Sequence, residues 1–548
     1  MEDRKIWATL HPFVEHGDIM GRSVANQGFL NALLRADSFD EYHFFLPDER
    51  TAEMVSGELA RRFPERHKDG AFRVRTRHVL PDAVAVEPYT VFHLSDCVAD
   101  SVPLMRLRNA LSREMFAITG TTHSLSYARY SLHFFDQIWP GVTERDAIIA
   151  TSTAGREALR AMFSALRKGY ALPDSFREPH IARIPLGIEP TDFPSCEEKP
   201  VLAAEAGKHL GIAEGHLTLL VFARISHYSK MDILPLLRML ARAERMGLPR
   251  GGYTLVLAGW MDTGDAAAAA YADIAASLGI AFCLVPSPDN ALRKKLFALA
   301  DMFLSPVDNP QETFGLTMLE AGISGVPVVA SDFDGYRDLV VHEETGILVP
   351  TLGPAMVPET DALSGVWFDN QRHLQIAQQS IVSVPDFASA VARLAVDPDL
   401  RRRMGEAARK RILENYTWDH VLRLHMALWE ELAVNPAPRP QDPHPLHPGY
   451  VEVFGGYYTQ LLDRTSLTVR WTDFGEAVYR GRDYPAVYAG VERLVSIDAL
   501  KRILFQARKP VPATSLLPGN TALPETERAA FLVLWALKQD LLERVSAE

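Results

Sequence analysis

The sequence has few cysteines and no long apolar segment. Its 548 residues include 3 cysteines, which are widely spaced and odd in number: Cys97, Cys196 and Cys283. This usage is typical of a reducing compartment, and no pair has the spacing of metal ligands. No stretch approaches the ~20 apolar residues of a membrane span, and the first residues lack the apolar core of a signal peptide. These absences predict a cytoplasmic protein without a transmembrane segment, and they leave peripheral membrane contact open.

The sequence also lacks an excess of positive charge. Lysine and arginine total 57 against 69 acidic residues, so the formal net charge is −12. Because phosphate backbones favour a basic protein face, we expect no nucleic acid as the main partner. Apolar residues make up 47% and charged residues 23% of the chain, as in ordinary soluble globular proteins. The length predicts two to four domains, each large enough to bury a core.

Short apolar runs alternate with helical patterns through much of the chain, which predicts parallel βαβ units of the α/β class. The strands expected in the first part are Ile6 to Leu10, Tyr42 to Leu46, Val91 to Leu94, Phe116 to Thr119, Ala147 to Ala150 and Ile181 to Pro185. Those of the second part are Leu217 to Ala223, Thr254 to Ala258, Ala281 to Val285, Met302 to Leu304 and Val326 to Ala330. Two doubly wound sheets in tandem place a ligand cleft at the carboxyl ends of their strands.

Glu312 and Glu320, with seven residues between them, are the most informative pair. A short buried strand is expected at residues 301–305, and a helix ending near Gly325 follows the loop that carries Glu312. The free N–H groups at the start of that helix suit an anionic ligand. Glu312 can accept hydrogen bonds from hydroxyl groups, and Glu320 reaches another part of a long ligand. Phosphate with hydroxyl groups on both sides describes a nucleotide sugar.

This segment resembles the donor-binding motif of the retaining family-4 glycosyltransferases of the GT-B fold, which include glycogen-synthase-like and mannosyltransferase-like enzymes. The resemblance covers about residues 5–433 and is strongest in 217–350. It implies two tandem Rossmann-like doubly wound domains. It also implies a hexosyltransferase-type enzyme that moves a sugar from a nucleoside diphosphate to an acceptor hydroxyl with retention of configuration. The sequence offers no good covalent nucleophile, in agreement with the same-face attack generally ascribed to the family.

Arg224 and Lys230 follow an expected strand, and the resemblance implies that they hold the donor diphosphate. Preorganised cations stabilise the charge that the leaving diphosphate gains as the glycosidic bond breaks. Ala223 and Met231 stand where glycines are more usual, so the path of this loop could differ. The catalytic residues that we expect are Glu312, His123, Arg224 and Lys230.

The resemblance also implies the contacts to the rest of the donor. His123 ends a strand of the first domain, in the place of the family's histidine near the donor sugar. Glu312 would bind the sugar hydroxyls and Glu320 the ribose, and the base would lie beside the strand end at Val285. Backbone N–H groups would approach phosphate or sugar at Phe314, Gly315, Leu316 and Thr317.

Gly21 resembles the family's glycine loop, which meets the phosphates and the sugar from the first domain. The second, adjacent glycine that is common in the family is missing here, and Gly17 and Asp18 could shape the loop instead. A glycine loop of this length is a weak signal by itself.

No metal or other cofactor is expected beyond the nucleotide-sugar co-substrate. Asp332 and Asp334 match the Asp-x-Asp metal motif of the other glycosyltransferase fold. However, they follow a strand at a place where family 4 usually has a glycine-rich turn. His444 and His447 could suggest a metal, yet no carboxylate or thiol cluster accompanies them, and a proline-rich linker is the favoured interpretation.

The predicted domains are an N-terminal acceptor-side domain (1–196), a nucleotide-sugar domain with a crossover helix (197–433), a linker (434–449) and a mostly helical accessory module (450–548). The module could dock a partner, form a homo-oligomer or bind the acceptor. The acceptor could be a glycan, a lipid-linked sugar, a small molecule or a protein. Two rival functions remain: a nucleotide-sugar epimerase or hydrolase on the same fold, and a non-catalytic sugar-nucleotide sensor.

Overall fold

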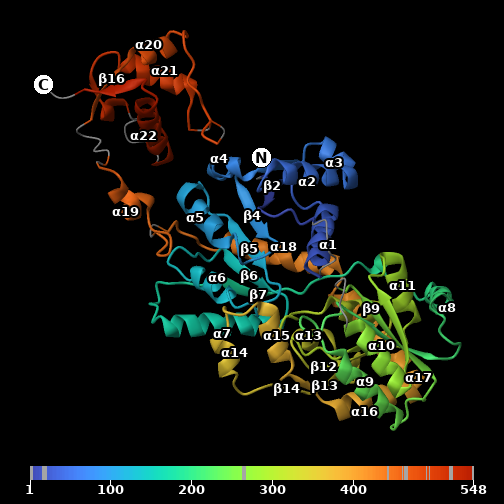
Figure 1. Cartoon of the computed structure of the whole chain (residues 1–548). Helices are drawn as coiled ribbons and strands as arrows, with labels where there is room; N and C mark the ends of the chain where they lie inside the picture. Colours follow the sequence, from blue (N-terminus) through green and yellow to red (C-terminus); the bar gives the residue numbers. More distant parts are fainter. Residues whose placement is uncertain are drawn as a thin grey trace. The chain divides into compact units, whose positions relative to one another are not determined.

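The computed structural model describes residues 4–14, 21–261, 267–440, 443–459, 461, 467–488, 490–492, 494–516 and 523–545. The chain divides into two compact units, Met1–Asp442 and Pro443–Glu548. The first unit contains two parallel sheets flanked by helices (Figure 1). This arrangement confirms the α/β prediction of two doubly wound domains in tandem.

The first sheet has seven parallel strands in the order β3-β2-β1-β4-β5-β6-β7. The strands are β1 (Ile6–Thr9), β2 (Glu41–Leu46), β3 (Phe72–Thr76), β4 (Tyr89–Leu94), β5 (Ala117–Thr121), β6 (Asp146–Ala150) and β7 (His180–Arg183). The helices are α1 (Gly21–Ala36), α2 (Glu49–Arg62), α3 (Pro64–Lys68), α4 (Leu80–Val86), α5 (Ser101–Leu111), α6 (Tyr130–Asp136) and α7 (Thr153–Gly169). The strand order reverses between β1 and β4, and the crevice of a doubly wound sheet lies at such a point.

The second sheet has six parallel strands in the order β10-β9-β8-β11-β12-β13. They are β8 (Leu217–Phe222), β9 (Tyr253–Gly259), β10 (Ala281–Pro286), β11 (Met302–Ser305), β12 (Val328–Ser331) and β13 (Gly346–Val349). The helices are α8 (Lys199–Leu210), α9 (Ile233–Glu244), α10 (Ala267–Leu278), α11 (Asn290–Leu299), α12 (Leu316–Ile323) and α13 (Tyr336–Leu339). Here the order reverses between β8 and β11, so the loops after these neighbouring strands flank the same crevice.

After β13 the chain returns to the first domain. Strands β14 (Thr351–Leu352) and β15 (Ile381–Val382) pair as a short antiparallel ribbon. Helices α14 (Pro358–Ala362) and α15 (Asp369–Ala377) lie between these strands in the sequence. Then come α16 (Val384–Val396), α17 (Pro398–Asn415) and α18 (Trp418–Val434). Helix α18 packs on α1, and its Trp418 and Trp429 belong to the first domain's core. The indole N–H of Trp429 donates to Thr119 Oγ1 of β5 over 3.1 Å.

The second unit has a core of its own around Val469, Leu500 and Trp535. Its helices α19 (Tyr450–Phe454), α20 (Asp473–Tyr479), α21 (Ile497–Gln506) and α22 (Leu523–Lys538) confirm the mostly helical prediction. A three-stranded antiparallel sheet of β17 (Val511–Pro512), β16 (Thr468–Trp471) and β18 (Leu542–Arg544) was not expected. None of the helices in the described residues combines the length and apolar character that crossing a membrane requires.

Two buried histidines, His425 of α18 and His93 of β4, lie where α18 packs on the first sheet. His425 donates through Nδ1 to Val421 O over 2.9 Å, and its ring lies 5.5 Å from that of His93 on β4. Burial lowers the pKa of His425 to about 4, and burial also lowers the pKa of His93. Both rings are therefore neutral in the folded protein at a pH where free histidine is protonated.

We predict that the free energy of unfolding falls as the pH drops from about 6.5 towards 4. In this range the two histidines bind protons in the unfolded chain but stay neutral in the folded chain. Replacing His425 by Gln should remove up to roughly 3 kcal/mol of that pH dependence. Urea unfolding at pH 7 and pH 4.5 measures it, with His420→Gln on the same helix as the matched control. An unchanged pH dependence in the His425 variant would contradict the prediction.

Candidate active site

A buried ion pair joins the loops that follow two neighbouring strands of the second sheet. Lys230, after β8, pairs through Nζ with Glu312 Oε2, after β11, and their side chains are 18% and 11% exposed. Burial lowers the pKa of Lys230, but the Glu312 carboxylate outweighs burial and raises it. Burial likewise raises the pKa of Glu312, and the ammonium of Lys230 reverses that shift. Each charge therefore keeps the other ionised in a site largely closed to water.

Backbone and hydroxyl groups complete the surroundings of the Glu312 carboxylate. Its Oε1 accepts from the N–H groups of Thr313 and Phe314 over 3.3 and 3.4 Å. The hydroxyl of Tyr336 lies 3.4 Å from Oε2 and 2.9 Å from Ser305 Oγ. The carboxylate is thus held in one orientation at the carboxyl edge of the sheet.

Gly315 sets the start of α12. Its φ is 98°, which L side chains rarely adopt, and a Cβ there would lie 2.3 Å from the ring of Tyr336. Gly315 provides no side-chain cap, so protein side chains do not cover the first N–H groups of α12 from that position. A Cβ built on Gly21 would lie 4.0 Å from Leu316 Cδ1. The start of α1 in the first domain therefore faces the start of α12, as expected for a shared anion site.

Arg224 lies in the same loop as Lys230. Its Nη1 is 3.5 Å from Ser229 Oγ, and its guanidinium lies over the ring of Trp260 at 5.9 Å. The positive charge of Arg224 also acts to lower the pKa of Lys230, so the two cations lie near each other. Trp260, directly after β9, was not anticipated from the sequence.

Glu320 lies in α12, and its side chain is 7% exposed. Its Oε1 pairs with Arg293 Nη2 of α11, whereas Oε2 is buried without a partner in the described part of the chain. Val285 is 6% exposed and packs in the core one residue before the end of β10, so it lies near the carboxyl edge of the sheet. Arg293 was missed because the run Asn-Ala-Leu-Arg-Lys-Lys resembles a solvated helix face.

His123 lies at the facing edge of the first sheet, directly after β5. Its Nε2 donates to the carbonyl of Ser95 over 2.7 Å. The N–H of Ser95 donates to His11 Nδ1 over 3.0 Å, and His11 Nε2 lies 3.0 Å from Asp100 Oδ2. Polar residues that follow β1, β4 and β5 thus form one network, and of these only His123 was predicted. The signal for His11 and Ser95 was their position directly after expected strands.

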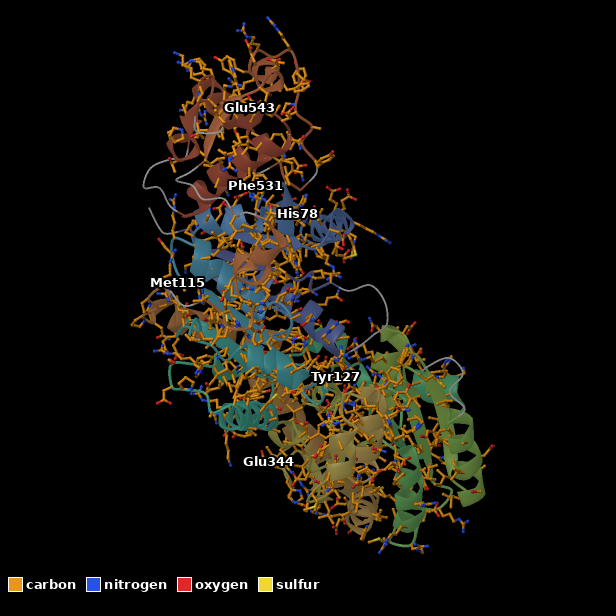
Figure 2. The ribbon with its side chains drawn as sticks, turned by 60° about the vertical axis from the view of Figure 1, so that its left-hand side comes forward. His78, Met115, Tyr127, Glu344, Phe531 and Glu543 are labelled. Carbon is orange, nitrogen blue, oxygen red and sulfur yellow. The ribbon has the colours of Figure 1, made fainter. Side chains whose placement is uncertain are left out.

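Hydrogen bonds bring the His123 loop to the Glu312 loop. Ser124 Oγ donates to the carbonyl of Gln311 over 2.8 Å, and Gln311 Nε2 donates to the hydroxyl of Tyr127 over 2.7 Å. Figure 2 shows Tyr127 at the junction of the two domains. The loop that carries His123 and the loop that carries Glu312 therefore contact each other across the two domains of the first unit. Gly17 and Asp18, the other glycine-loop candidates, lie outside the described residues.

The Asp-x-Asp sequence does not present two equivalent carboxylates. Asp332 is bound by Arg337, whose Nε donates to Oδ1 over 2.8 Å. Asp334 is half-buried, and burial together with the charge of Glu312 raises its pKa to about 7. The two side chains therefore have different surroundings, which is a poor fit to a shared divalent ion.

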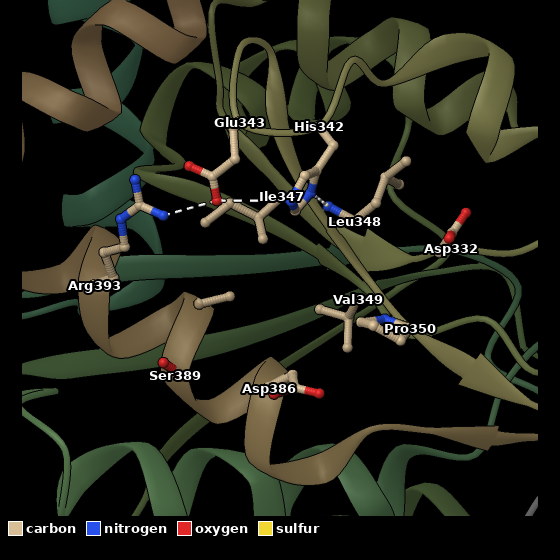
Figure 3. Close-up of a pocket in the computed structure, with 11 residues that line it drawn as sticks. Asp332, His342, Glu343, Ile347, Leu348, Val349, Pro350, Asp386, Ser389 and Arg393 are labelled. Atoms are coloured by element: carbon tan, nitrogen blue, oxygen red, sulfur yellow. Dashed lines mark hydrogen bonds and ion pairs between the residues drawn. The ribbon is translucent and has the colours of Figure 1, made fainter.

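A surface cavity of about 500 Å³ lies away from this crevice, between β13 and α16 (Figure 3). Its upper wall carries the ion pair of Glu343 and Arg393, 2.7 Å apart. Of the residues weighed from the sequence, only Asp332 lines it.

The comparisons with known proteins agree with this geometry. The family model "Glycosyl transferases group 1" matches residues 216–359, and a "Glycosyl transferase-like" model matches residues 294–427. The structure of sucrose-phosphate synthase from Thermosynechococcus elongatus superposes with a TM-score of 0.50 at 18% identity, covering 78% of this chain and 99% of that one. The chain has the GT-B fold, and its second domain is similar to the group 1 glycosyl transferases.

Two relatives are D-inositol 3-phosphate glycosyltransferases. That of Nocardia farcinica is 27% identical over 252 residues, which cover 45% of this chain and 51% of the relative. That of Thermobispora bispora is 32% identical over 154 residues, or 28% of this chain and 35% of the relative. The chain thus spans about half or less of the length of these relatives.

The ion pair of Lys230 and Glu312 should show strong energetic coupling. Lys230→Met leaves a buried carboxylate without a counter-charge and should cost about 3 kcal/mol of unfolding free energy. The double variant with Glu312→Gln should lose less than the two single variants together, by ~1 kcal/mol or more. Denaturant unfolding followed by circular dichroism gives the unfolding free energies of the wild type, the two single variants and the double variant. Strictly additive losses would contradict the pairing.

The exposed pair of Arg402 and Glu406 on α17 provides the control. Glu406→Gln should change the unfolding free energy by less than ~1 kcal/mol, as is usual for surface ion pairs.

Proposed function

We propose that the chain is a retaining hexosyltransferase that moves a sugar from a nucleoside-diphosphate sugar to an acceptor hydroxyl. The observation that carries this proposal is the buried pair of Lys230 and Glu312 beside the start of α12, with Gly21 facing it from the other domain. A cation, a carboxylate and the start of a helix at one point suit a phosphate joined to a sugar. The similarity of the second domain to the group 1 glycosyl transferases supports the same assignment.

Each charge of the pair has a role in the proposed reaction. Arg224 and Lys230 hold the diphosphate and stabilise the charge that it gains in the transition state. Glu312 accepts hydrogen bonds from hydroxyls of the transferred sugar, and Glu320 accepts them from the ribose. When the donor binds, its phosphate lies beside Lys230. Lys230 then neutralises this phosphate as well as the carboxylate of Glu312.

In the proposed transfer the bond from the anomeric carbon to the phosphate oxygen breaks while the acceptor oxygen attacks from the same face. The acceptor proton passes to the leaving phosphate. His123, whose ring is oriented by its bond to the Ser95 carbonyl, contacts the donor sugar from the first domain. The acceptor reaches the crevice from that side, and the reaction takes place in the cytoplasm.

A thermal-shift screen with UDP-, GDP-, ADP- and dTDP-sugars tests donor binding, since a ligand at 100 times its Kd adds ~2.7 kcal/mol of stability. With the donor so found, Arg224→Ala should lower kcat/KM by about 100-fold or more. We would measure kcat/KM by the transfer of radiolabelled sugar from the donor to a panel of acceptors that includes D-inositol 3-phosphate. Arg402→Ala, on the exposed face of α17, is the control. Near-normal turnover in the Arg224 variant would refute the diphosphate assignment.

The proposed reaction should survive removal of divalent metal. Arg224, Lys230 and the start of α12 already meet the phosphate charge, so a metal ion has little left to neutralise. Turnover in EDTA should therefore remain within about twofold of its value in buffer. Complete loss that manganese restores would contradict this and implicate Asp332 and Asp334.

A further inference from the structure

The contact between Arg293 and Glu320 is an incomplete pair. Arg293 uses Nη2 to bind Glu320 Oε1. In the described part of the chain, Arg293 Nε and Glu320 Oε2 are both buried and both lack a hydrogen-bond partner. One is an N–H donor and the other a carboxylate acceptor. Buried polar atoms are rarely left without partners, so these two indicate a group that the protein binds.

A hydroxyl group fits both atoms at once. The Nε–H and Nη2–H bonds of a guanidinium form one edge of a planar fork that usually binds both carboxylate oxygens. Here only one arm of the fork is used. A hydroxyl can accept a hydrogen bond from Nε and donate one to Oε2, because it is both acceptor and donor. Phosphate would meet repulsion from the carboxylate, and an apolar group would leave both atoms unsatisfied.

Aromatic rings hold the guanidinium in place. Arg293 lies over Phe193 at 4.9 Å and over Phe222 at 5.9 Å. These contacts restrict the side chain, so the direction of its unused N–H is set before any ligand arrives. The side chains of Arg293 and Glu320 are only 20% and 7% exposed. A hydroxyl bound there loses its contact with water and depends on both partners.

The pair also lies at the right edge of the sheet. Arg293 is in the first turn of α11, which follows the carboxyl end of β10, and Glu320 is in the second turn of α12. Both helices start from the edge that carries Arg224, Lys230 and Glu312. A nucleotide with its phosphate at the start of α12 would therefore place the hydroxyl groups of its ribose within reach of this pair.

We propose that Arg293 is a second partner of the ribose hydroxyl that the proposed function assigns to Glu320, and that Arg293 makes the site select ribonucleotides over deoxyribonucleotides. This inference rests on the proposed function. Glu320 alone could accept a hydrogen bond from any nearby hydroxyl. Arg293 supplies the second bond and fixes the orientation of the carboxylate, so it is a specificity-determining residue.

Calorimetry with UDP, GDP and ADP and with their 2′-deoxy and 3′-deoxy counterparts tests the inference on the full chain. For the base that binds, one of the two deoxy compounds should bind about 10- to 100-fold more weakly, because it leaves both buried atoms unsatisfied. Arg293→Lys keeps the charge but lacks the fork, so the preference for the ribonucleotide should fall to within about threefold. Lys294→Met, next on the same helix and paired with Glu198, should retain the preference.

The outcomes separate the two proposals. Equal affinity of the wild-type protein for ribo and both deoxy compounds would overturn the hydroxyl site and leave the donor assignment intact. A full preference retained in Arg293→Lys would overturn the role of Arg293. Failure of every nucleoside diphosphate and nucleotide sugar to bind the wild-type protein would instead overturn the proposed function.

Discussion

The buried contact between Lys230 and Glu312 is the interaction on which the rest of the site depends. Two charges taken out of water are tolerated only when they are paired and hydrogen-bonded. The pair ties the loop after β8 to the loop after β11, and Tyr336 and two backbone N–H groups complete it. Gly315 can then start α12 against Tyr336 with a left-handed backbone. The proposed anion site at the start of α12 thus depends on the contacts that satisfy one buried carboxylate.

The crevice also depends on contacts between the domains. Helix α18 buries its tryptophans in the first domain's core, and Ser124 and Tyr127 hold Gln311, the residue before Glu312. These contacts keep His123 and Gly21 opposite the second sheet. The same crossover places His93 and His425 in an apolar environment that keeps both neutral. Acid sensitivity is therefore built into the connection that positions the two halves of the site.

Strands buried on both faces were predictable because they are continuous apolar runs, as in Leu217 to Ala223. β3 was missed because Phe-Arg-Val-Arg-Thr alternates arginine with apolar residues, and it is a partly exposed edge strand. β16, the central strand of its sheet, was missed because Arg470 interrupts a run of only four residues. Of the candidate site, Arg224, Lys230 and Glu312 were predicted from their positions after strands together with the family resemblance. Arg293 was not found, because one arginine in a basic helix resembles surface charge.

The sequence by itself determined which residues lie at the carboxyl ends of the strands. That order follows from alternating apolar runs and helices, because parallel strands bring their ends to one edge. Only the tertiary structure decided which charges meet. Lys230 lies 82 positions from Glu312, and Arg293 lies 27 from Glu320. Their pairing depends on which strands are neighbours in the sheet and on the free-energy cost of burying a charge alone, and local sequence encodes neither.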